Sequence, residues 1–554
     1  MYLGIDVGGT HTDGVLLNQD FDIARSAKVR TRADDVMASL NEVLEAILDG
    51  ADPAEARRLV VSSTLGLNAV LTGRADRVGV MCTGGPGLSP AWLDDGPLFA
   101  LLEAGLDHRG EVIAPFSEEE AAGEAKSLID NGARALAVIS KFGPKNPQFE
   151  MEMARVAAGL APGLPITQAS ALAGRLNFPR RLNTAVFNSA VIRLYEKFLN
   201  GLEASALKMG LSCPVSLLSS EGGAMSIEEA RKSPVMILAA GPAAGILGLW
   251  SMADLEGDAL MIDIGGTSTD LAVMADGRPL MTAEGLDIKG KPTLARAFLT
   301  SSIALGGDSA ITFRDGQVRV GPEREGPALS LCPDEAPGRR PTLTDALNVL
   351  RLAEVGDAAI SFRSFEALGG AGPEAIAGAA LDCAMRLVEE AVRELIFRIN
   401  NRPVYTINEV RLAREVRPQR AALLGGPAEA LAVPLTEKLN LPVMVPPQSE
   451  VANAVGAACS RPSVTAELYA DTSSGRLSIP SLGIYRTIDR SYNVKMAETE
   501  LLGHLEALFS GPEAEKPVIT HAQSFHQLSG YGRSDKIIRV QAQIAPGVMS
   551  CRKN

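Results

Sequence analysis

The sequence predicts an α/β protein built from two duplicated lobes, with a small α+β region at its C-terminal end. Three observations carry this prediction: the chain has 554 residues, strand-like and helix-like apolar patterns alternate along it, and one eight-residue motif occurs twice. A chain of this length has room for three to four domains of ordinary size. We expect a first lobe over residues 1–182, a second lobe with a crossing helix and insertions over 183–460, and a C-terminal region over 461–554.

Composition and charge exclude several classes of protein. Hydrophobic residues make up 46% of the chain and charged residues 21%, which excludes a disordered scaffold. The net charge of −13 argues against binding to nucleic acid or to an anionic membrane. The six cysteines form no Cys-x-x-Cys pair, so no zinc ribbon or iron–sulfur site is encoded locally. We expect a cytoplasmic protein without a signal peptide.

The elements of the first 170 residues alternate between strand and helix. The patterns predict these elements in order: a helix over 35–48, a strand over 77–82, a helix over 118–131 and a buried strand over 133–140. The longest uninterrupted helical pattern covers 183–209, and we expect this helix to cross between the lobes. Residues 235–253 carry no charge, but Gly241-Pro242 divides them into a predicted strand, a turn and a helix, which argues against a membrane span.

The internal repeat decides the architecture. Residues 4–14 read GIDVGGTHTDG and residues 261–271 read MIDIGGTSTDL, so that D-[VI]-G-G-T-x-T-D recurs at an offset of 257 positions. An apolar run precedes and follows each copy. The double glycine of each copy is therefore predicted to form a hairpin turn between two strands.

This hairpin suits an anionic ligand. Glycine accepts a positive φ and lets backbone N–H groups approach an anion, threonine adds a hydroxyl group, and the leading aspartate can hold a metal ion through water. A single Gly-Gly-Thr turn is most simply a tight hairpin. Two matching copies instead predict a pair of turns around a polyphosphate and its Mg²⁺; the dinucleotide and Walker fingerprints are both absent.

The two hairpins resemble the phosphate-binding hairpins of the actin, sugar kinase and heat-shock chaperone superfamily of ATPases. The resemblance implies two ribonuclease-H-like lobes with ATP in the cleft between them. Two further glycine turns follow in the superfamily's order: Gly306-Gly307, and Gly425-Gly426 as the adenosine loop, followed by a helical stretch from Ala428 that Pro434 is predicted to interrupt. Ala452–Ala458 is similar to the helix that leads back to the first lobe, where small residues let helices approach closely.

Further blocks resemble the hydantoinase A/oxoprolinase family within this superfamily. They include STLGLNA at 63–69, SSEGG at 219–223, AGPAAG at 240–245 and PTLTDA at 341–346, and the resemblance covers residues 1–460 in order. It implies an ATP-dependent subunit that phosphorylates the carbonyl oxygen of a cyclic amide, such as a hydantoin or 5-oxoproline, before the ring opens. A separate B-type subunit is the implied partner; the oligomeric state is left open.

Two alternatives remain at this stage. One is a carboxylase-type or small-molecule kinase subunit of the same superfamily, which would phosphorylate a ketone enol or an alcohol. The other is a nucleotide-gated activator ATPase, whose turnover would respond to a protein partner rather than to a small molecule.

The resemblance implies roles for the residues of the hairpins and turns. Asp6 and Asp263 are the candidate catalytic residues and would hold Mg²⁺ through water. The candidate nucleotide-binding residues are Gly8, Gly9, Thr10, Gly265, Gly266, Thr267, Gly306, Gly307, Gly425 and Gly426. His11, Asp13 and Asp270 stay without an assigned role; the two aspartates could equally cap the hairpin backbone.

Four polar residues are candidates for contact with the substrate by their motif positions: Asn68, Asn188, Glu221 and Asp345. Glu221 stands where the family usually has asparagine. Asp345 could instead cap the start of the helical pattern at 346–353. In the C-terminal region we expect strands over 477–479 and 536–544 around a helix over 498–509, and the spacing of His521 and His526 suits no zinc pair.

Overall fold

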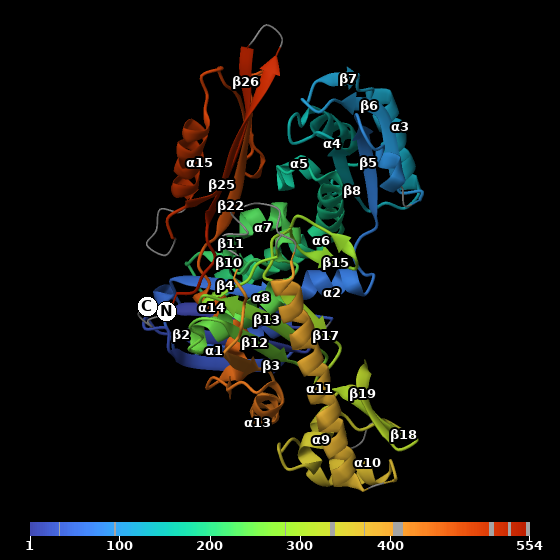
Figure 1. The fold of residues 1–554 in the computed structure, drawn as a ribbon, viewed down its shortest axis with the longest axis vertical. Helices are drawn as coiled ribbons and strands as arrows, with labels where there is room; N and C mark the ends of the chain where they lie inside the picture. Colours follow the sequence, from blue (N-terminus) through green and yellow to red (C-terminus); the bar gives the residue numbers. More distant parts are fainter. Residues whose placement is uncertain are drawn as a thin grey trace. The chain divides into compact units, whose positions relative to one another are not determined.

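The protein forms two compact units in the computed structural model (Figure 1). The structure describes residues 1–32, 34–93, 96–282, 284–332, 338–370, 372–402, 414–508, 515–529 and 533–549. Unit 1 comprises Met1–Ala243, Thr282–Ala297 and Ala457–Asn554, and unit 2 comprises Ala244–Met281 and Phe298–Gly456. These units are defined by packing; the division at residues 182 and 460 stays a prediction.

The first sheet of unit 1 carries the N-terminal hairpin. Its strand order is β11-β10-β4-β1-β2-β3, with β1 antiparallel to β2 and parallel to β4. The strands are β1 (Tyr2–Val7), β2 (His11–Leu17), β3 (Ile23–Arg30), β4 (Arg58–Ser63), β10 (Val215–Leu218) and β11 (Ala224–Ser226). All residues of β1 and β4 are buried.

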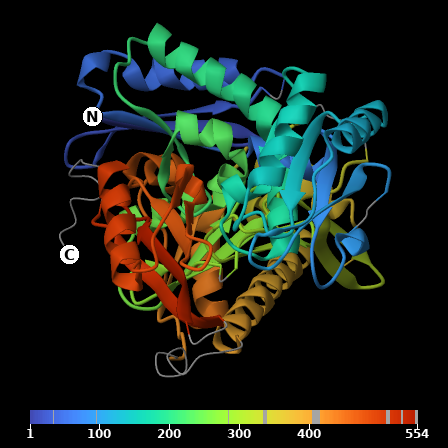
Figure 2. The same cartoon turned by 90° about the horizontal axis from the view of Figure 1, so that it is seen from above.

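Two helices pack side by side against this sheet, as Figure 2 shows. Helix α1 (Val36–Leu48) begins at Asp35, whose carboxylate accepts a hydrogen bond from the Ala38 N–H. Helix α6 (Phe178–Lys208) begins at Asn177 in the same way and lies wholly in unit 1. Leu40, Leu44 and Ile47 of α1 meet the apolar side of α6 and of the sheet in one core.

The second sheet of unit 1 has the order β7-β6-β5-β8-β9, and β5 is parallel to both β6 and β8. Its strands are β5 (Val78–Gly84), β6 (Phe99–Leu106), β7 (Val112–Ala114), β8 (Ala135–Ser140) and β9 (Ile166–Gln168). Helices α3 (Glu118–Asp130) and α4 (Gln148–Leu160) contribute Ala125 and Met153 to its core.

The third sheet of unit 1 is antiparallel and belongs to the C-terminal region. Its order is β24-β23-β22-β26-β25, from β22 (Val464–Asp471), β23 (Arg476–Ile479), β24 (Ile484–Thr487), β25 (Val518–Ser529) and β26 (Arg533–Ile544). Helix α15 (Val494–Leu508) shares a core with Ala466, Leu468 and Ala470 of β22. Strands have a period of two, so Glu467, Tyr469 and Asp471 lie on the opposite face of β22.

Unit 2 repeats the arrangement of the first sheet. Strand β12 (Ala259–Ile264) is antiparallel to β13 (Thr269–Ala275) and parallel to β20 (Arg420–Leu424), as β1 is to β2 and β4. The sheet order is β14-β13-β12-β20-β21, and β17 (Thr300–Ile303) also pairs with β13. The predicted α/β fold with a duplicated lobe and an α+β C-terminal region is therefore confirmed.

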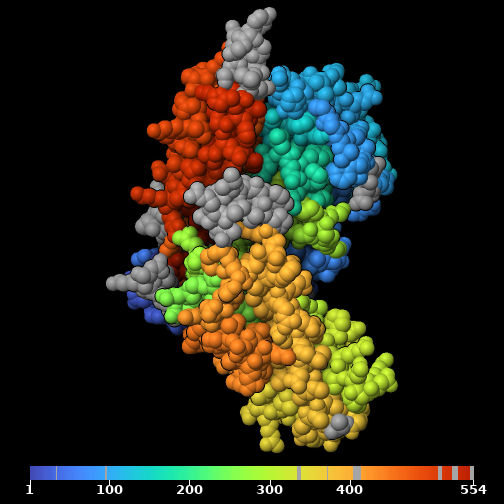
Figure 3. Space-filling view, in the orientation of Figure 1, coloured from blue at the N-terminus to red at the C-terminus, as the bar shows by residue number. Residues whose placement is uncertain are grey.

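Three groups of elements complete unit 2. Helices α11 (Pro373–Asn400) and α13 (Ala428–Leu439) pack on its sheet. Helices α9 (Leu343–Val349) and α10 (Ala358–Glu366) and the hairpin of β18 (Ser309–Arg314) and β19 (Gln317–Arg324) form one end of unit 2, yellow in Figures 1 and 3. Helix α14 (Ala452–Cys459) begins in this unit.

The remaining elements are short. They are α2 (Leu65–Leu71), α5 (Ala169–Leu172), α7 (Ile227–Lys232), α8 (Ala240–Met252), β14 (Arg278–Pro279), β15 (Asp287–Ile288), β16 (Lys291–Pro292), β21 (Val443–Met444) and the 3-10 helices at 53–55, 90–93, 234–237, 329–331, 449–451 and 480–482.

Two local predictions are wrong. The uncharged run after Ser233 forms a 3-10 turn at Pro234–Ile237 rather than a strand, because Pro234 starts a helical turn. Pro434 does not interrupt its helix: α13 continues from Ala428 to Leu439 with the proline inside it. A proline removes one backbone donor, and the buried Leu431 and Leu435 on either side hold α13 against the core of unit 2.

Candidate functional site

The two hairpins have the same backbone geometry. The Gly8 N–H donates to the carbonyl of His11 at 3.0 Å, and the Gly265 N–H donates to the carbonyl of Ser268 at 2.9 Å. In the register of the strands Asp6 lies opposite Asp13, and Asp263 lies opposite Asp270. The repeat in the sequence is thus a repeat of two hairpins, one in each unit.

The turn of the first hairpin is hydrogen-bonded to Thr31, and two of its residues are exposed to solvent. The Thr31 hydroxyl donates to the Gly8 carbonyl at 2.9 Å, and the Thr31 N–H donates to the Thr10 carbonyl at 2.8 Å. Gly9 and Thr10 are exposed, so their N–H and hydroxyl groups can be reached by a ligand. Asn68 on α2 lies beside the turn, since a Cβ atom on Gly9 would stand 3.4 Å from its amide nitrogen.

The second hairpin is surrounded by the other two glycine turns. The Gly307 N–H donates to the Gly265 carbonyl at 3.0 Å. A Cβ atom on Gly306 would lie 2.5 Å from the Gly266 carbonyl oxygen, and one on Gly425, where φ is +106°, would lie 2.0 Å from the Ile264 carbonyl oxygen. No side chain fits at either position, so glycine is required for this close approach. Unit 2 brings together three turns that are far apart in the sequence.

Asp263 is the next-to-last residue of β12 and lies beside this group of turns. Its carboxylate lies 3.3 Å from the position of a Cβ atom on Gly245 of α8, and the amide oxygen of Asn453 lies 3.2 Å from the same position. Gly245 thus keeps a space beside both polar side chains. Asp263 is half-buried and Asp6 is buried, with 5% of its surface exposed.

The second aspartates of the two hairpins have different surroundings. Asp13 forms an ion pair with Lys28 on β3 at 3.0 Å. Asp270 accepts a hydrogen bond from Ser302 on β17, and burial raises the pKa of its carboxyl group. The first residue of β2, His11, is exposed. Both aspartates therefore contact the neighbouring strand, Asp13 through an ion pair and Asp270 through a hydrogen bond.

Two of the four substrate candidates, Asn188 and Asp345, are held by hydrogen bonds to other parts of the protein. The buried amide of Asn188 donates to Thr167 and to the Lys232 carbonyl, and its oxygen accepts from the Val235 N–H. Asp345 is fully buried in the first turn of α9, where it completes the capping box of Thr342 and accepts four further hydrogen bonds, from Leu329, Ser330, Thr342 and Ser361. These geometries favour structural roles for both residues.

Glu221 is placed differently. Its side chain lies in the loop between β10 and β11, where it forms an ion pair with Arg296 at 3.0 Å and accepts a hydrogen bond from Ser463 at 3.2 Å. The loop turns through Gly222, whose φ is +87°. The Glu221 carboxylate thus has a cation, the guanidinium of Arg296, as its neighbour.

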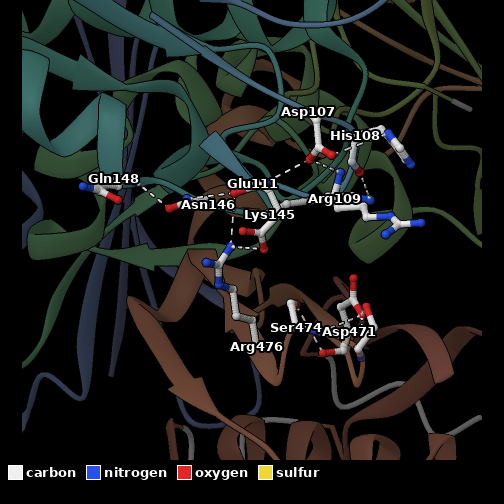
Figure 4. Close-up of polar contacts among 12 residues, drawn as sticks. Asp107, His108, Arg109, Glu111, Lys145, Asn146, Gln148, Asp471, Ser474 and Arg476 are labelled. Carbon is white, nitrogen blue, oxygen red and sulfur yellow. Dashed lines mark hydrogen bonds and ion pairs between the residues drawn. The ribbon is translucent and has the colours of Figure 1, made fainter. Parts of the chain in front are cut away.

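A polar cluster around Lys145 was not predicted from the sequence (Figure 4). The Lys145 ammonium donates to the His108 carbonyl at 2.5 Å and lies 5.2 Å from the centre of the Tyr469 ring. Burial lowers the pKa of Lys145, and the charges of Asp471 and Asp107 oppose this shift.

The same cluster borders a cavity of about 700 Å³ whose wall includes Lys145, Tyr469 and Arg476. The guanidinium of Arg476 donates to the Gly110 carbonyl across 366 positions of sequence. No local motif carries such long-range contacts, so the sequence offered no signal for this cavity.

Neither a clustered metal site nor a membrane-spanning helix occurs among the residues that the structure describes. Among the described residues, no group of three or more His, Cys, Asp or Glu side chains is placed to hold a metal ion. Within the same ranges, none of the helices combines the length and the apolar character needed to cross a membrane. Five cysteines lie within the described residues, and none of them forms a disulfide bond there; Cys551 lies outside the described residues.

Two protein-family models match the sequence of this chain. The family described as "Hydantoinase/oxoprolinase" matches residues 181–466, and the "Hydantoinase/oxoprolinase N-terminal region" matches residues 2–160. The chain belongs to the hydantoinase/oxoprolinase family. Both conserved-region matches include one of the two hairpins, so the family assignment rests on the same segments as the site.

Three relatives in the family illustrate its range. The chain is 25% identical to the caprolactamase subunit alpha of Pseudomonas jessenii over 482 residues, which are 80% of this chain and 68% of that protein. It is 25% identical to the acetophenone carboxylase gamma subunit of Aromatoleum aromaticum over 63% of this chain and 53% of that protein. It is 29% identical to 5-oxoprolinase 1 of Arabidopsis thaliana over 39% of this chain, but only 17% of that protein.

Solved structures support the fold of this hydantoinase/oxoprolinase chain. Nucleotide-free acetone carboxylase matches all of this chain and 88% of its own, with a TM-score of 0.70 and 16% identity. The ATP-dependent caprolactamase from Pseudomonas jessenii matches 98% of this chain and 87% of its own, with a TM-score of 0.72 and 17% identity. At these identities the likeness extends to the fold alone.

Proposed function

We propose that this protein is an ATP- and Mg²⁺-dependent enzyme of the hydantoinase/oxoprolinase type, which activates and opens a cyclic amide. The observation that carries the proposal is the pair of matching hairpins, one of them enclosed by the turns at Gly306 and Gly425. The relatives named as caprolactamase and 5-oxoprolinase act on cyclic amides, and the caprolactamase is described as ATP-dependent.

The residues present fit a nucleotide with its metal ion. The turn residues Gly9, Thr10, Gly266 and Thr267 are exposed, so their N–H and hydroxyl groups are free to meet phosphate oxygens. A Cβ atom on Gly425 would lie only 2.0 Å from the Ile264 carbonyl oxygen, so no side chain can stand there. The edge of the predicted adenosine loop is therefore formed by backbone. Gly245 presents no side chain to the Asp263 carboxylate, and a carboxylate is a group that can hold a hydrated Mg²⁺.

The proposed roles follow from this fit. ATP would supply the phosphoryl group that turns the amide oxygen into a leaving group. The Gly8–Thr10 and Gly265–Thr267 turns would orient the phosphates by their N–H and hydroxyl groups, and Asp6 and Asp263 would hold the waters of Mg²⁺. Asn68, beside the first turn, and Glu221 are retained as candidates for substrate contact, whereas Asn188 and Asp345 position loops.

The relatives are named as subunits, so we propose that the protein works with a separate subunit of the B type. The proposed enzyme would release ADP faster when a lactam or hydantoin is added, with or without that partner. If no cyclic amide stimulates ADP release with the partner present, the proposed substrate class is wrong.

The first prediction concerns the aspartates that lead the hairpins. We expect Asp6→Asn and Asp263→Asn each to lower lactam-stimulated ADP release by about 100-fold or more, because each removes a charge that would balance a metal–phosphate centre. Circular dichroism should stay as in the wild type. Asp130→Asn, an exposed aspartate paired with Lys126, is the control and should retain full activity. Unchanged turnover in both hairpin variants would show that the nucleotide binds elsewhere.

A second candidate function is supported by the acetophenone carboxylase gamma subunit and the acetone carboxylase fold. In that case a ketone enol rather than an amide would accept the phosphoryl group. The products separate the two: amide opening gives an amino acid and free phosphate, whereas ADP release stimulated by ketones and not by any lactam would favour the carboxylase type.

A further inference from the structure

Three arginines of unit 1 lie in one charged region, and we call Arg175, Arg296 and Arg539 the arginine cluster. Arg175 lies in the loop between α5 and α6, Arg296 in the segment after β16, and Arg539 on β26. The loop of Arg175 lies against β22, since a Cβ atom on Gly174 would stand 3.5 Å from the Glu467 carboxylate. The electrostatic field at Arg175 includes repulsion from both other arginines.

Two members of the arginine cluster already have acidic partners. Arg296 forms an ion pair with Glu221 at 3.0 Å and donates to the side-chain oxygen of Gln543 at 3.2 Å. Arg539 donates to the carboxylate of Glu467 on the neighbouring strand β22. Both guanidinium groups are thereby fixed in place by carboxylates that are mostly buried, with 12% and 13% of their side chains exposed.

Arg175 is the exception. No hydrogen bond or ion pair joins its guanidinium to any residue that the structure describes, although it is half-buried. Burial lowers the pKa of Arg175, the charges of Arg539 and Arg296 add to this shift, and the charges of Glu467 and Glu284 oppose it. Removing a guanidinium from water without a partner costs free energy, and placing it between like charges adds to that cost. An anionic ligand would offset both costs.

The chemistry of the ligand follows from the guanidinium fork. Its N–H donors match the two oxygens of a carboxylate or of a phosphate, and the pairing is strong because both groups are charged. Glu284 also lies near Arg175 but is paired with Arg180, so that four guanidinium groups meet three carboxylates and one positive charge is left for a ligand. In a chain with a net charge of −13, a local surplus of positive charge is the opposite of the molecule as a whole.

We propose that the arginine cluster binds an oxyanion of the substrate, with Arg175 as the residue that contacts it. The oxyanion we assign is the carboxylate of a cyclic amide of the 5-oxoproline type, rather than a phosphate. This assignment rests on the proposed function, because it takes the substrate to be a cyclic amide. Arg296 and Arg539 position Arg175 by repelling its guanidinium away from their own partners. Arg175 would then decide between carboxylated and neutral lactams.

The test compares two lactams that differ in one group. 5-Oxoproline and 2-pyrrolidinone share the five-membered ring, and only the first has a carboxylate. Calorimetric binding to the full-length protein without ATP should be tighter for 5-oxoproline. In Arg175→Gln the dissociation constant of 5-oxoproline should rise about 10- to 100-fold, while that of 2-pyrrolidinone stays unchanged. Arg175→Lys should restore part of the affinity.

Controls and further probes make the outcome decisive. Arg231→Gln removes a guanidinium of α7 that pairs with Glu203, and it should bind both lactams as the wild type does. Wild-type affinity for 5-oxoproline in Arg175→Gln, or an equal loss for both lactams, overturns the proposal. So does an Arg175-dependent affinity for inorganic phosphate alone, because the oxyanion is then a phosphate.

One more probe separates this proposal from the proposed function. Glutarate carries carboxylates but no lactam ring. Binding of glutarate that depends on Arg175, in a protein whose ADP release ignores every lactam, would support the arginine cluster and overturn the lactam-opening function. A wild-type protein that binds neither 5-oxoproline nor glutarate overturns the assignment of the cluster.

Discussion

Asp13 and Asp270 occupy the same place in the two copies of the motif, yet they differ in charge balance. Asp13 has a cation opposite it, Lys28 on the neighbouring strand, at 3.0 Å. Asp270 has Ser302 in the corresponding place, and a hydroxyl group offers a hydrogen bond but no charge. An ionised carboxylate in buried surroundings without a cation is a cost to the fold. The two copies thus share the aspartate but differ in the free-energy cost of ionising it.

A stability prediction follows for Asp270. Its folded-state pKa is raised, so the favourable contribution of its protonated form is present at low pH and is lost as the pH rises through that pKa. At pH 7 the group is a net cost, and Asp270→Asn should raise the melting temperature by about 1–3 °C. Asp13→Asn, which loses a half-exposed ion pair, should lower it slightly. A lower melting temperature for Asp270→Asn at pH 7 would contradict the prediction.

Individual residues also show where sequence reasoning stops. The glycines at 306 and 425 could be selected from their motifs, and the structure explains them by backbone contacts that no Cβ atom could share. Asn188 and Asp345 could be selected too, but their partners are mostly backbone groups of distant loops, such as Lys232 and Ser330. A motif identifies a special polar residue without indicating whether it meets a ligand or another loop.

At the scale of elements, the close packing of α8 and α14 depends on two glycines. A Cβ atom on Gly248 of α8 would lie 2.2 Å from the Ala452 carbonyl oxygen, and one on Gly456 of α14 would lie 2.1 Å from the Ala244 carbonyl oxygen. The small residues predicted to permit a close helix approach are confirmed at Gly456. The approach in turn fixes Gly245 and Asn453 beside Asp263.

We therefore expect Gly456→Ala to force the two helices apart and to lower the free energy of unfolding by about 1–3 kcal/mol, measured by urea denaturation. Gly378→Ala in α11 is the matched control, since a Cβ atom there meets no atom within 4 Å. That control should be neutral or stabilising by up to about 1 kcal/mol, because alanine favours a helix. Equal effects of both substitutions would show that helix propensity, not packing, governs Gly456.

Helices and strands with a clear apolar periodicity can be predicted from the sequence, and those without it cannot. Helix α11 runs over 373–400, and its apolar stripe and its first-turn proline are local signals that a sequence shows. Strands β22 and β25 were not predicted. Strand β22 alternates small apolar residues with polar ones such as Glu467 and Tyr469, and these polar residues make their contacts with distant segments. Local patterns could not reveal those contacts.

At the scale of the whole molecule, the chain has 66 acidic and 53 basic residues. Each basic residue that pairs with a carboxylate therefore matters for how the free energy of unfolding changes at low pH. Asp258, directly before β12, accepts hydrogen bonds from Arg414 at 2.8 and 2.6 Å and from the Arg417 N–H at 2.9 Å. The Arg414 hydrogen bonds lower the pKa of Asp258 to about 2. This pair joins the segment before β20 to the start of the second repeat.

The sign of the pH effect is fixed by that shift. A lowered folded-state pKa contributes stability above the unfolded pKa, near 4, and loses it as the pH falls toward 2. Asp258→Asn should therefore lower the free energy of unfolding at pH 7 by about 1 kcal/mol, because Arg414 is partly exposed and solvent screens the pair. Urea titrations should show the difference from wild type closing between pH 4 and pH 2. A difference that stays constant over this range would refute the pKa shift.

The division into two compact units also gives the protein a built-in pair of optical reporters. The chain has two tryptophans: Trp92, which is 55% exposed, belongs to unit 1, and Trp250, on α8, belongs to unit 2. Replacing either one by phenylalanine leaves a single indole whose emission reports on one unit alone. Ligand-induced changes and unfolding can then be followed separately in each half of the duplication without any attached dye.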